Sequence, residues 1–300
     1  MSELNTSTLS ELHLNTTVFV FGGGWAGSQT ARELADMGYA VTLVENSQDV
    51  AEARGQAEFL RRAAGEAASA VVKDAEGIEC LTGTSLVHCA GMPGQFRLKL
   101  IQGTQTVERE AGALVLASDV KVQPLFAAYG LTPSERVVSQ SQFETMADGS
   151  LGSGKKVAFV LGFGQEGHPL TMKRVMQSVQ AVQDQGSQAY VYVNNIKVAA
   201  NGLERLYLAN RESGALYFKL SSAPEISANG AQILSTDPVL GQEVALEPDL
   251  LVVEEEISAP QEAPKLAEIL RIDLGPWNFL QENNVHRFPV RSNREGIFVV

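Results

Sequence analysis

The chain has 300 residues, of which 44% are hydrophobic and 19% charged, which is enough for two ordinary globular domains. Its formal net charge of −12 excludes nucleic acid and anionic membrane surfaces as favoured partners, because both carry the same sign of charge. The polar N-terminal residues give no secretory signal, and no apolar run is long enough to span a bilayer, so a cytoplasmic protein without direct membrane insertion is expected.

The first half of the chain opens with a βαβ pattern. Residues 17–21 are a continuous β-branched and aromatic run, as expected for a strand buried on both faces of a parallel sheet. A glycine cluster separates this strand from a helix predicted over 26–37, and a second buried strand is predicted at 41–44. Residues 50–72 are alanine-rich and predict a helix. Short strands are then predicted at 78–81, 85–89, 96–101 and 112–117.

The second half repeats this kind of pattern without repeating the sequence. After a glycine- and serine-containing linker at 151–154, a buried strand is predicted at 156–161. A second glycine turn leads to a helix predicted over about 170–185 and a strand at 189–193. Further apolar runs, at 249–253 and 296–300, predict strands near the C-terminus.

The first glycine turn has the pattern G-x-G-x-x-G between a strand and a helix: Gly22, Gly23, Gly24, Trp25, Ala26, Gly27. Gly22 permits the tight turn, Gly24 lets a pyrophosphate approach the backbone, and Gly27 lets the helix lie close to the strand. The helix N-terminus then faces the anion. Glu45, at the end of the second strand, is placed to hydrogen-bond ribose hydroxyls. The turn therefore predicts a dinucleotide site, with FAD as the expected cofactor.

The second turn has a similar spacing but a weaker chemical case: Gly162, Phe163, Gly164, Gln165, Glu166, Gly167. Glu166 would place a carboxylate beside a phosphate, and Pro169 removes an N–H donor near the helix start. Asn194 and Asn195, rather than an acid, follow the next strand. A structural Rossmann-like half and a second dinucleotide site for NAD(P)H are both compatible with this turn.

The remaining chemically interesting residues predict no catalytic group. The four histidines have no metal-ligand spacing, so no metal site is expected. Cys80 and Cys89 are too few for an iron–sulfur cluster and are interpreted as buried small residues rather than a redox pair. Residues 254–256, three consecutive glutamates, are interpreted as a solvated charge run.

With these motifs, the chain resembles the flavoproteins that carry two dinucleotide-binding domains. More narrowly, it resembles the flavoprotein subunit of heterodisulfide reductase and the related subunits of the quinone-interacting membrane-bound oxidoreductase (Qmo) complex. The resemblance rests on segments in matching order: 18–27, 90–96, 112–118, 129–131, 249–253 and 296–299.

The resemblance implies an α/β fold of the two-domain, disulfide-reductase-like Rossmann type. A discontinuous FAD-binding domain, 1–153 plus 249–300, would carry an inserted smaller domain of the NAD(P)-binding type at 154–248. It also implies FAD as cofactor, electron transfer inside a multisubunit complex, and redox-protein subunits as partners. A homo-oligomer is a further possibility.

Several positions depart from the family pattern. The usual Ala-Thr-Gly before the insertion reads Ala117, Ser118, Asp119, so Ser118 and a carboxylate stand near the expected cofactor. No glycine pair follows the ribose-binding acid within 46–55, and the family's cluster cysteines are missing. The chain ends at Val300, just before the expected Gly-Asp of the flavin site.

Three hypotheses therefore stand at the level of sequence. The first is an FAD-binding oxidoreductase component that transfers electrons in a complex. The second is a redox-inactive assembly or regulatory subunit that retains the flavoprotein fold, and the third is an NAD(P)H-dependent flavin reductase using the turn at Gly162. Retention of flavin and binding of NADH or NADPH would separate the three.

Overall fold

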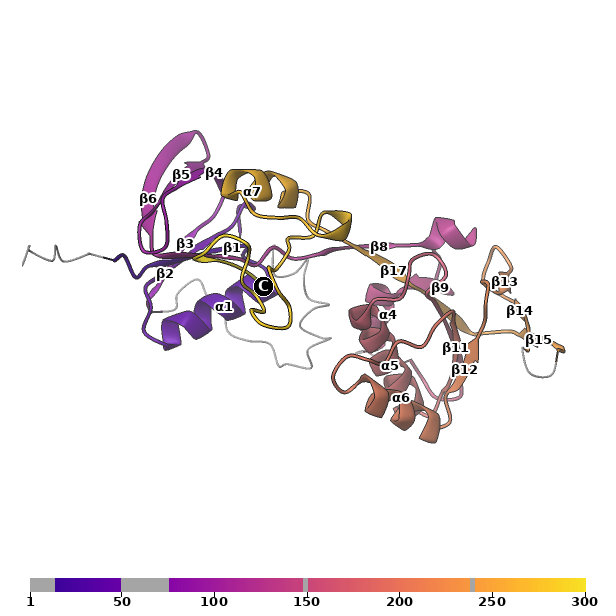
Figure 1. Cartoon of the computed structure of the whole chain (residues 1–300). Coiled ribbons are helices and arrows are strands. Elements are labelled where there is room, and N and C mark those ends of the chain that lie inside the picture. The colour runs from indigo at the N-terminus through magenta and orange to yellow at the C-terminus, as the bar shows by residue number, and fades with distance from the viewer. Residues whose placement is uncertain (1–13, 50–75, 148–150, 238–240) are drawn as a thin grey trace, which may run out of the picture. The chain divides into compact units, whose positions relative to one another are not determined.

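The computed structural model describes residues 14–49, 76–147, 151–237 and 241–300 (Figure 1). The helix predicted for 50–72 lies outside these residues. The described residues form two compact units. Unit 1 contains residues 14–49, 76–120 and 259–300, and unit 2 contains residues 121–258 with its two short gaps.

Unit 1 is built on a five-stranded parallel sheet in the order β18-β7-β1-β2-β3. Its strands are β1 (Val18–Phe21), β2 (Val41–Val44), β3 (Ile78–Leu81), β7 (Ala113–Leu116) and β18 (Ile297–Val299). Helix α1 (Trp25–Asp36) covers one face, where Ala31 and Leu34 pack against Val20 and Leu43. This arrangement is the βαβ unit predicted from the sequence.

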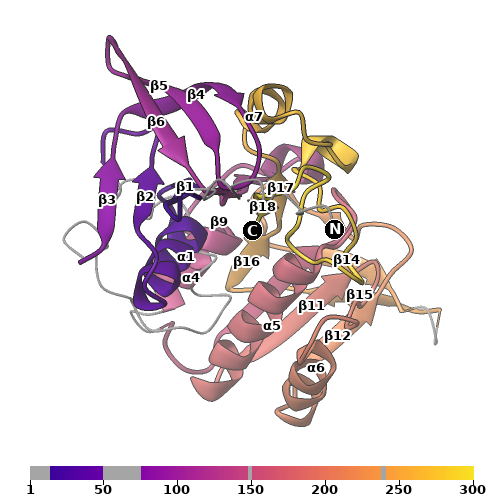
Figure 2. The same ribbon diagram turned by 60° about the vertical axis from the view of Figure 1, so that its left-hand side comes forward.

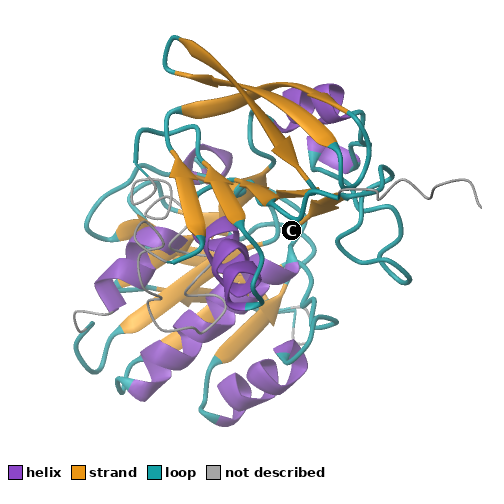
Figure 3. Cartoon of the chain, turned by 90° about the vertical axis from the view of Figure 1, so that its left-hand side faces the viewer, coloured by secondary structure: helices purple, strands orange, loops and turns teal. Residues whose placement is uncertain are grey.

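The other face of this sheet is covered by two further elements. One is an antiparallel sheet of β4 (Thr84–Ala90), β5 (Phe96–Gln102) and β6 (Gln105–Ala111), drawn as the long twisted strands at the top of Figure 3. The other is α7 (Ala263–Leu270). Phe96 and Leu98 of β5 and Leu270 of α7 share one apolar core with Phe19 and Leu114 of the parallel sheet.

Unit 2 is a second five-stranded parallel sheet, in the order β12-β11-β10-β16-β9. Its strands are β9 (Val137–Ser139), β10 (Lys156–Leu161), β11 (Gln188–Val193), β12 (Leu216–Lys219) and β16 (Leu250–Val253). One face carries helices α4 (Gln140–Ala147), α5 (Pro169–Asp184) and α6 (Leu203–Glu212) (Figure 2). The other face packs against the antiparallel strands β13 (Glu225–Ile226), β14 (Ile233–Thr236) and β15 (Glu243–Leu246).

The predicted fold class, a two-domain Rossmann-type α/β protein, is confirmed, but unit 2 is longer than the predicted insertion 154–248. Strand β16 pairs with β10, and β9 pairs with the other edge of β16, so both strands belong to the second sheet. The chain enters and leaves this unit through β8 (Lys121–Pro124) and β17 (Glu255–Ser258), which pair antiparallel. An apolar run such as 250–253 does not reveal which of two parallel sheets it joins, because both sheets bury their strands on both faces.

Candidate functional site

The first glycine turn joins β1 to α1 and is tightly packed. Gly22 has φ +114, and a Cβ there would lie 2.3 Å from the carbonyl oxygen of Ala117. A Cβ on Gly27 would lie 1.8 Å from the carbonyl oxygen of Gly22. The tight turn at Gly22 and the close helix approach at Gly27 are therefore properties of the structure, as a dinucleotide-binding turn requires.

Glu45 follows β2, and its carboxylate lies against the glycine turn. Its Oε2 accepts a hydrogen bond from the Gly23 amide at 2.5 Å, and its Oε1 accepts one from the Ser47 amide at 2.7 Å. The acid is thus at the expected strand end, next to the turn. Two backbone amides hold it in place, and they leave its remaining lone pairs for other donors.

Asp119 lies directly over the second glycine of the motif. A Cβ on Gly24 would lie 1.3 Å from Asp119 Oδ2, and the Ala26 amide, in the first turn of α1, hydrogen-bonds the same side chain. Asp119 Oδ1 is buried, and no described residue provides it with a hydrogen-bond partner. Burial raises the pKa of Asp119 to about 7, with a further rise from the nearby charge of Glu45.

A pocket of ≈ 360 Å³ opens beside this turn within unit 1. It is lined by the last residues of β1 and β2, Phe21 and Val44, by Glu45 directly after β2, and by Ser118. Its other wall, which the sequence motifs do not reveal, includes Thr84, Ser85, Leu86, Gln261, Glu262 and Lys265. No local pattern marks these residues, because only folding brings the start of β4, the start of α7 and the residues before α7 to the turn.

The elements around the first turn fit a dinucleotide, but the position of Asp119 does not. A pyrophosphate bound at this kind of turn approaches the second glycine and accepts hydrogen bonds from helix N-terminal amides. Here the Asp119 carboxylate fills the space over Gly24 and uses the Ala26 amide. The residues as described therefore do not fit the pyrophosphate of FAD.

The second glycine turn, which joins β10 to α5, also has its amides bound by an internal carboxylate. Glu254, at the end of β16, accepts hydrogen bonds from the amides of Gly162 at 2.6 Å and Gly164 at 2.9 Å. The Tyr129 hydroxyl donates a third hydrogen bond to Glu254 at 2.5 Å. Burial, together with the charge of Glu254, raises the pKa of Tyr129 and keeps this donor protonated.

Two polar side chains at the second turn, Glu166 and His168, interact with other residues of unit 2. Glu166, interpreted as repulsive toward phosphate, forms an ion pair with Lys197. His168 caps α5 by accepting a hydrogen bond from the Leu170 amide through Nδ1, and burial lowers its pKa. A Cβ on Gly167 would make only ordinary contact with Met172, so packing does not require a glycine there. Local contacts therefore account for Glu166 and His168, but close packing does not account for Gly167.

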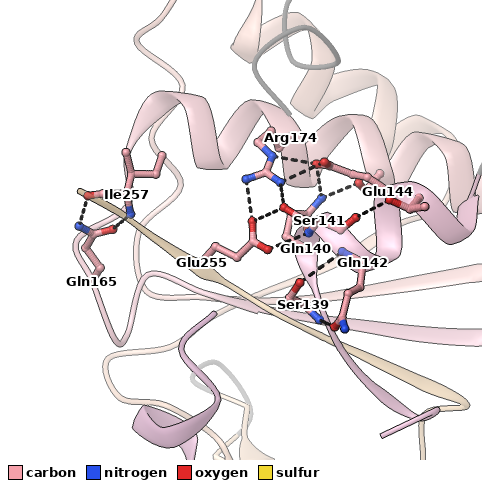
Figure 4. Close-up of polar contacts among 11 residues, drawn as sticks. Ser139, Gln140, Ser141, Gln142, Glu144, Gln165, Arg174, Glu255 and Ile257 are labelled. Atoms are coloured by element: carbon pink, nitrogen blue, oxygen red, sulfur yellow. Dashed lines mark hydrogen bonds and ion pairs between the residues drawn. The ribbon is translucent and has the colours of Figure 1, made fainter. Parts of the chain in front are cut away.

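The interpretation of residues 254–256 as a solvated charge run is wrong for two of the three. Glu254 and Glu255 are each 3% exposed. Glu255 accepts a hydrogen bond from Arg174 of α5, which is itself 2% exposed and also pairs with Glu144 of α4 (Figure 4). Because isolated charges are costly to bury, these acids are buried only where donors meet them.

The two cysteines, the only ones in the chain, lie in different cores of unit 1. Cys89 of β4 belongs to the core under β5 and α7, whereas Cys80 of β3 packs on the α1 side of the sheet. Neither forms a disulfide, and burial raises the pKa of Cys89, which disfavours its thiolate. Cys89 is buried as interpreted from the sequence, whereas Cys80 is only half-buried, and the two lie in separate cores rather than side by side.

The described part of the chain holds neither a metal-ligand cluster nor a membrane-spanning helix. No three or more of its His, Cys, Asp or Glu side chains are grouped so that they could hold a metal ion. No helix within it is long and apolar enough to cross a membrane.

Two parallel sheets, each with a glycine turn between its central strand and a covering helix, define the class of two-domain dinucleotide-binding oxidoreductases. The model of the pyridine nucleotide-disulphide oxidoreductase family matches residues 3–156, about half of the chain. The chain belongs to this family, which supports the general expectation of an FAD- or NAD(P)-dependent oxidoreductase. No curated protein matches the chain in a sequence search.

Solved structures with a similar fold include disulfide reductases. Thioredoxin reductase of Lactococcus lactis has 15% sequence identity and a TM-score of 0.54, covering 95% of this chain and 89% of its own. The HOCl-induced flavoprotein disulfide reductase RclA of Escherichia coli has 13% identity and a TM-score of 0.51, and the match covers 95% of this chain and 65% of RclA. At these identities the similarity concerns the fold alone.

Proposed function

We propose that this chain is the flavoprotein-type component of an electron-transfer complex of the heterodisulfide reductase or Qmo kind, with FAD as the ligand of unit 1. Family membership and the β1–α1 turn with Glu45 support the cofactor. The observation that carries the role in a complex is the position of Cys80 and Cys89 in separate cores. A self-contained disulfide reductase needs two thiols that can reach each other.

The small number of cysteines has a direct consequence for partners. The chain has two cysteines in all, so it offers no dithiol and too few thiolates for a conventional iron–sulfur cluster. A dithiol or cluster that exchanges electrons with a flavin bound here would therefore have to belong to another protein. This requirement favours one component of a larger complex over an enzyme that completes a reaction on its own.

A second candidate, a redox-inactive assembly or regulatory subunit, is favoured by one specific observation. The carboxylates of Asp119 and Glu254 lie on the two glycine turns, where nucleotide phosphates bind in active proteins of this class. Glu254 also weighs against NAD(P)H at the second turn, because a buried carboxylate beside that turn repels a pyrophosphate.

The first test is the visible absorption spectrum of the purified protein before and after incubation with FAD, with release of any chromophore on denaturation. Near-stoichiometric FAD supports the flavoprotein role, whereas a protein that takes up none supports the redox-inactive subunit. Titration with NADPH, followed by quenching of protein fluorescence, tests the second turn in the same preparation. Native co-purification that yields an iron–sulfur protein would support the complex, and a flavin-loaded protein that reduces disulfides unaided would contradict it.

A further inference from the structure

We propose that Asp119 is a self-blocking side chain: its carboxylate occupies the pyrophosphate position over Gly24, so FAD binds unit 1 only when Asp119 leaves that position. This inference rests on the proposed function, since it concerns the same ligand. It assigns to one residue the control of whether this member of the family binds its dinucleotide.

The first argument is spatial. Asp119 Oδ2 lies 1.3 Å from the position that a Cβ on Gly24 would take, so the carboxylate occupies the space that the missing side chain leaves. The backbone of Gly24 is extended, with φ −66 and ψ −160, so it lies outside the left-handed region that favours glycine. The glycine is therefore required at this position by the approach of another group, and in the described structure that group is Asp119.

The second argument concerns hydrogen bonds. The Ala26 amide, one of the N–H groups at the start of α1, is used by Asp119 instead of by a ligand. The same helix N-terminus that attracts a phosphate also attracts a carboxylate, because both are anions. Asp119 and a pyrophosphate therefore compete for the same donors, and they cannot occupy them together.

The third argument is that Asp119 is poorly satisfied where it lies. An acid that caps a helix as a purely structural device usually has a lowered pKa, because the amides favour its charged form. At Asp119 the balance is reversed: burial and the charges of Glu45 and Glu262 raise the pKa, and Oδ1 has no hydrogen-bond partner among the described residues. Such a carboxylate gains little from staying in place, which is what a displaceable side chain requires.

The position of Asp119 follows from the topology of unit 1. Strand β7 pairs parallel with β1 in a register that places Leu116 opposite Phe21. The residues after Leu116 therefore run beside the residues after Phe21, which form the glycine turn. Asp119, three residues beyond the end of β7, is brought to the start of α1 by this pairing, whereas Ser118 lines the neighbouring pocket.

The test compares FAD binding in full-length variants of Asp119. Asp119→Asn removes the charge but keeps the volume, and Asp119→Gly removes both. Asp249→Asn, at an exposed site in unit 2, is the matched control for the substitution itself. Binding is measured by equilibrium dialysis with FAD. Binding is also followed by quenching of the fluorescence of Trp25. The chain has two tryptophans, Trp25 and Trp277, and Trp277 is 81% exposed, so a Trp277→Phe background leaves Trp25 as the tryptophan that is observed.

The expected order of affinity is Asp119→Gly, then Asp119→Asn, then wild type and Asp249→Asn, with at least about a tenfold gain for Asp119→Gly, as expected when a buried like charge is removed. Equal, tight binding by wild type and Asp119→Gly would overturn the self-blocking role and leave the FAD proposal standing. No binding by any folded variant would overturn both, in favour of the redox-inactive subunit. If circular dichroism shows that Asp119→Gly does not fold, Asp119→Asn alone must still bind more tightly than wild type.

Discussion

Arg174 and Glu255, 81 residues apart in the sequence, form a buried ion pair with an N–O distance of 2.9 Å. The guanidinium also donates two hydrogen bonds to Glu144, at 2.8 and 3.0 Å, and one to Ser141. The view in Figure 4 shows these side chains converging from α4, α5 and β17. One arginine thus connects the helical layer of unit 2 to the segment through which the chain leaves that unit.

Replacing this arginine is expected to destabilise unit 2 strongly. Arg174→Met should lower the free energy of unfolding by about 3–5 kcal/mol, because it leaves Glu144 and Glu255 in a buried site without their cation. Lys155→Met is the control, since the Lys155–Asp249 pair is exposed and its loss should cost less than about 1 kcal/mol. Urea unfolding followed by circular dichroism measures both, and equal losses would contradict the buried network.

The raised pKa of Asp119 predicts a pH dependence with a definite sign. Its folded pKa, about 7, lies above the ordinary value of 3.8, so the unfolded chain loses this proton at a lower pH than the folded chain. Stability therefore falls as pH rises between these values, by up to about 1.4 kcal/mol per pH unit for one proton. The charged groups that raise the value are Glu45 and Glu262.

Asp119→Asn should remove this dependence. The variant and the wild type are expected to have similar stability below about pH 3.8, and the variant should become progressively the more stable of the two as pH rises from there to about 7. Asp249→Asn should behave oppositely, because the Lys156 amide lowers the pKa of Asp249 and its contribution is lost on acidification. Chemical unfolding at several pH values measures both, and a constant difference at Asp119 would exclude ionisation there.

The features predicted correctly from the sequence are those with strong local patterns. Strand 17–21, helix 26–37 and strand 41–44 correspond to β1, α1 and β2 within one residue at each end, because buried runs and a glycine turn separate them sharply. Strand 156–161 is β10. The extent of the second unit depends on nonlocal strand pairing, since β16 pairs with β10 and β9 pairs with β16, and no local pattern shows this.

The candidate site likewise combines residues that local sequence patterns identify and contacts that depend on nonlocal strand pairing. The motif identified Gly22, Gly27 and Glu45, whose roles depend on neighbours in the βαβ unit. The identification of Asp119 as a departure from the family came from the sequence, but its contact with Gly24 depends on the register of β7 against β1. The burial of Glu254 was not predicted because three consecutive acids are normally solvated, and no local pattern reveals Tyr129 as a donor 125 residues away.

The bond from Tyr129 to Glu254 should be stronger than an ordinary tyrosine hydrogen bond. Tyr129→Phe removes a donor from a buried carboxylate and should cost about 1.5–3 kcal/mol of unfolding free energy. Tyr217→Phe is the matched control, because the Tyr217 hydroxyl donates to the neutral side chain of Asn210 at 2.8 Å and should cost about 0.5–1.5 kcal/mol. Urea unfolding distinguishes them, and an equal or smaller loss at Tyr129 would contradict the role of Glu254.

A double-mutant cycle tests the contact between Asp119 and Gly24 without any ligand. Gly24→Ala should destabilise the wild type by about 1–3 kcal/mol, because the new methyl group collides with Asp119 Oδ2. In the Asp119→Gly background the same change should be neutral or stabilising by about 0.4–1 kcal/mol, since the Gly24 backbone suits alanine and the unfolded chain loses freedom. The coupling free energy is the difference between these two effects.

Gly27→Ala is the control for this cycle. Its Cβ would meet the backbone carbonyl of Gly22 at 1.8 Å, and removing the Asp119 side chain does not relieve that collision. Gly27→Ala should therefore cost the same in both backgrounds, whereas the cost of Gly24→Ala should depend on Asp119. If Gly24→Ala costs the same with and without the carboxylate, then Asp119 does not occupy the space over Gly24 in solution, and the pyrophosphate position is open.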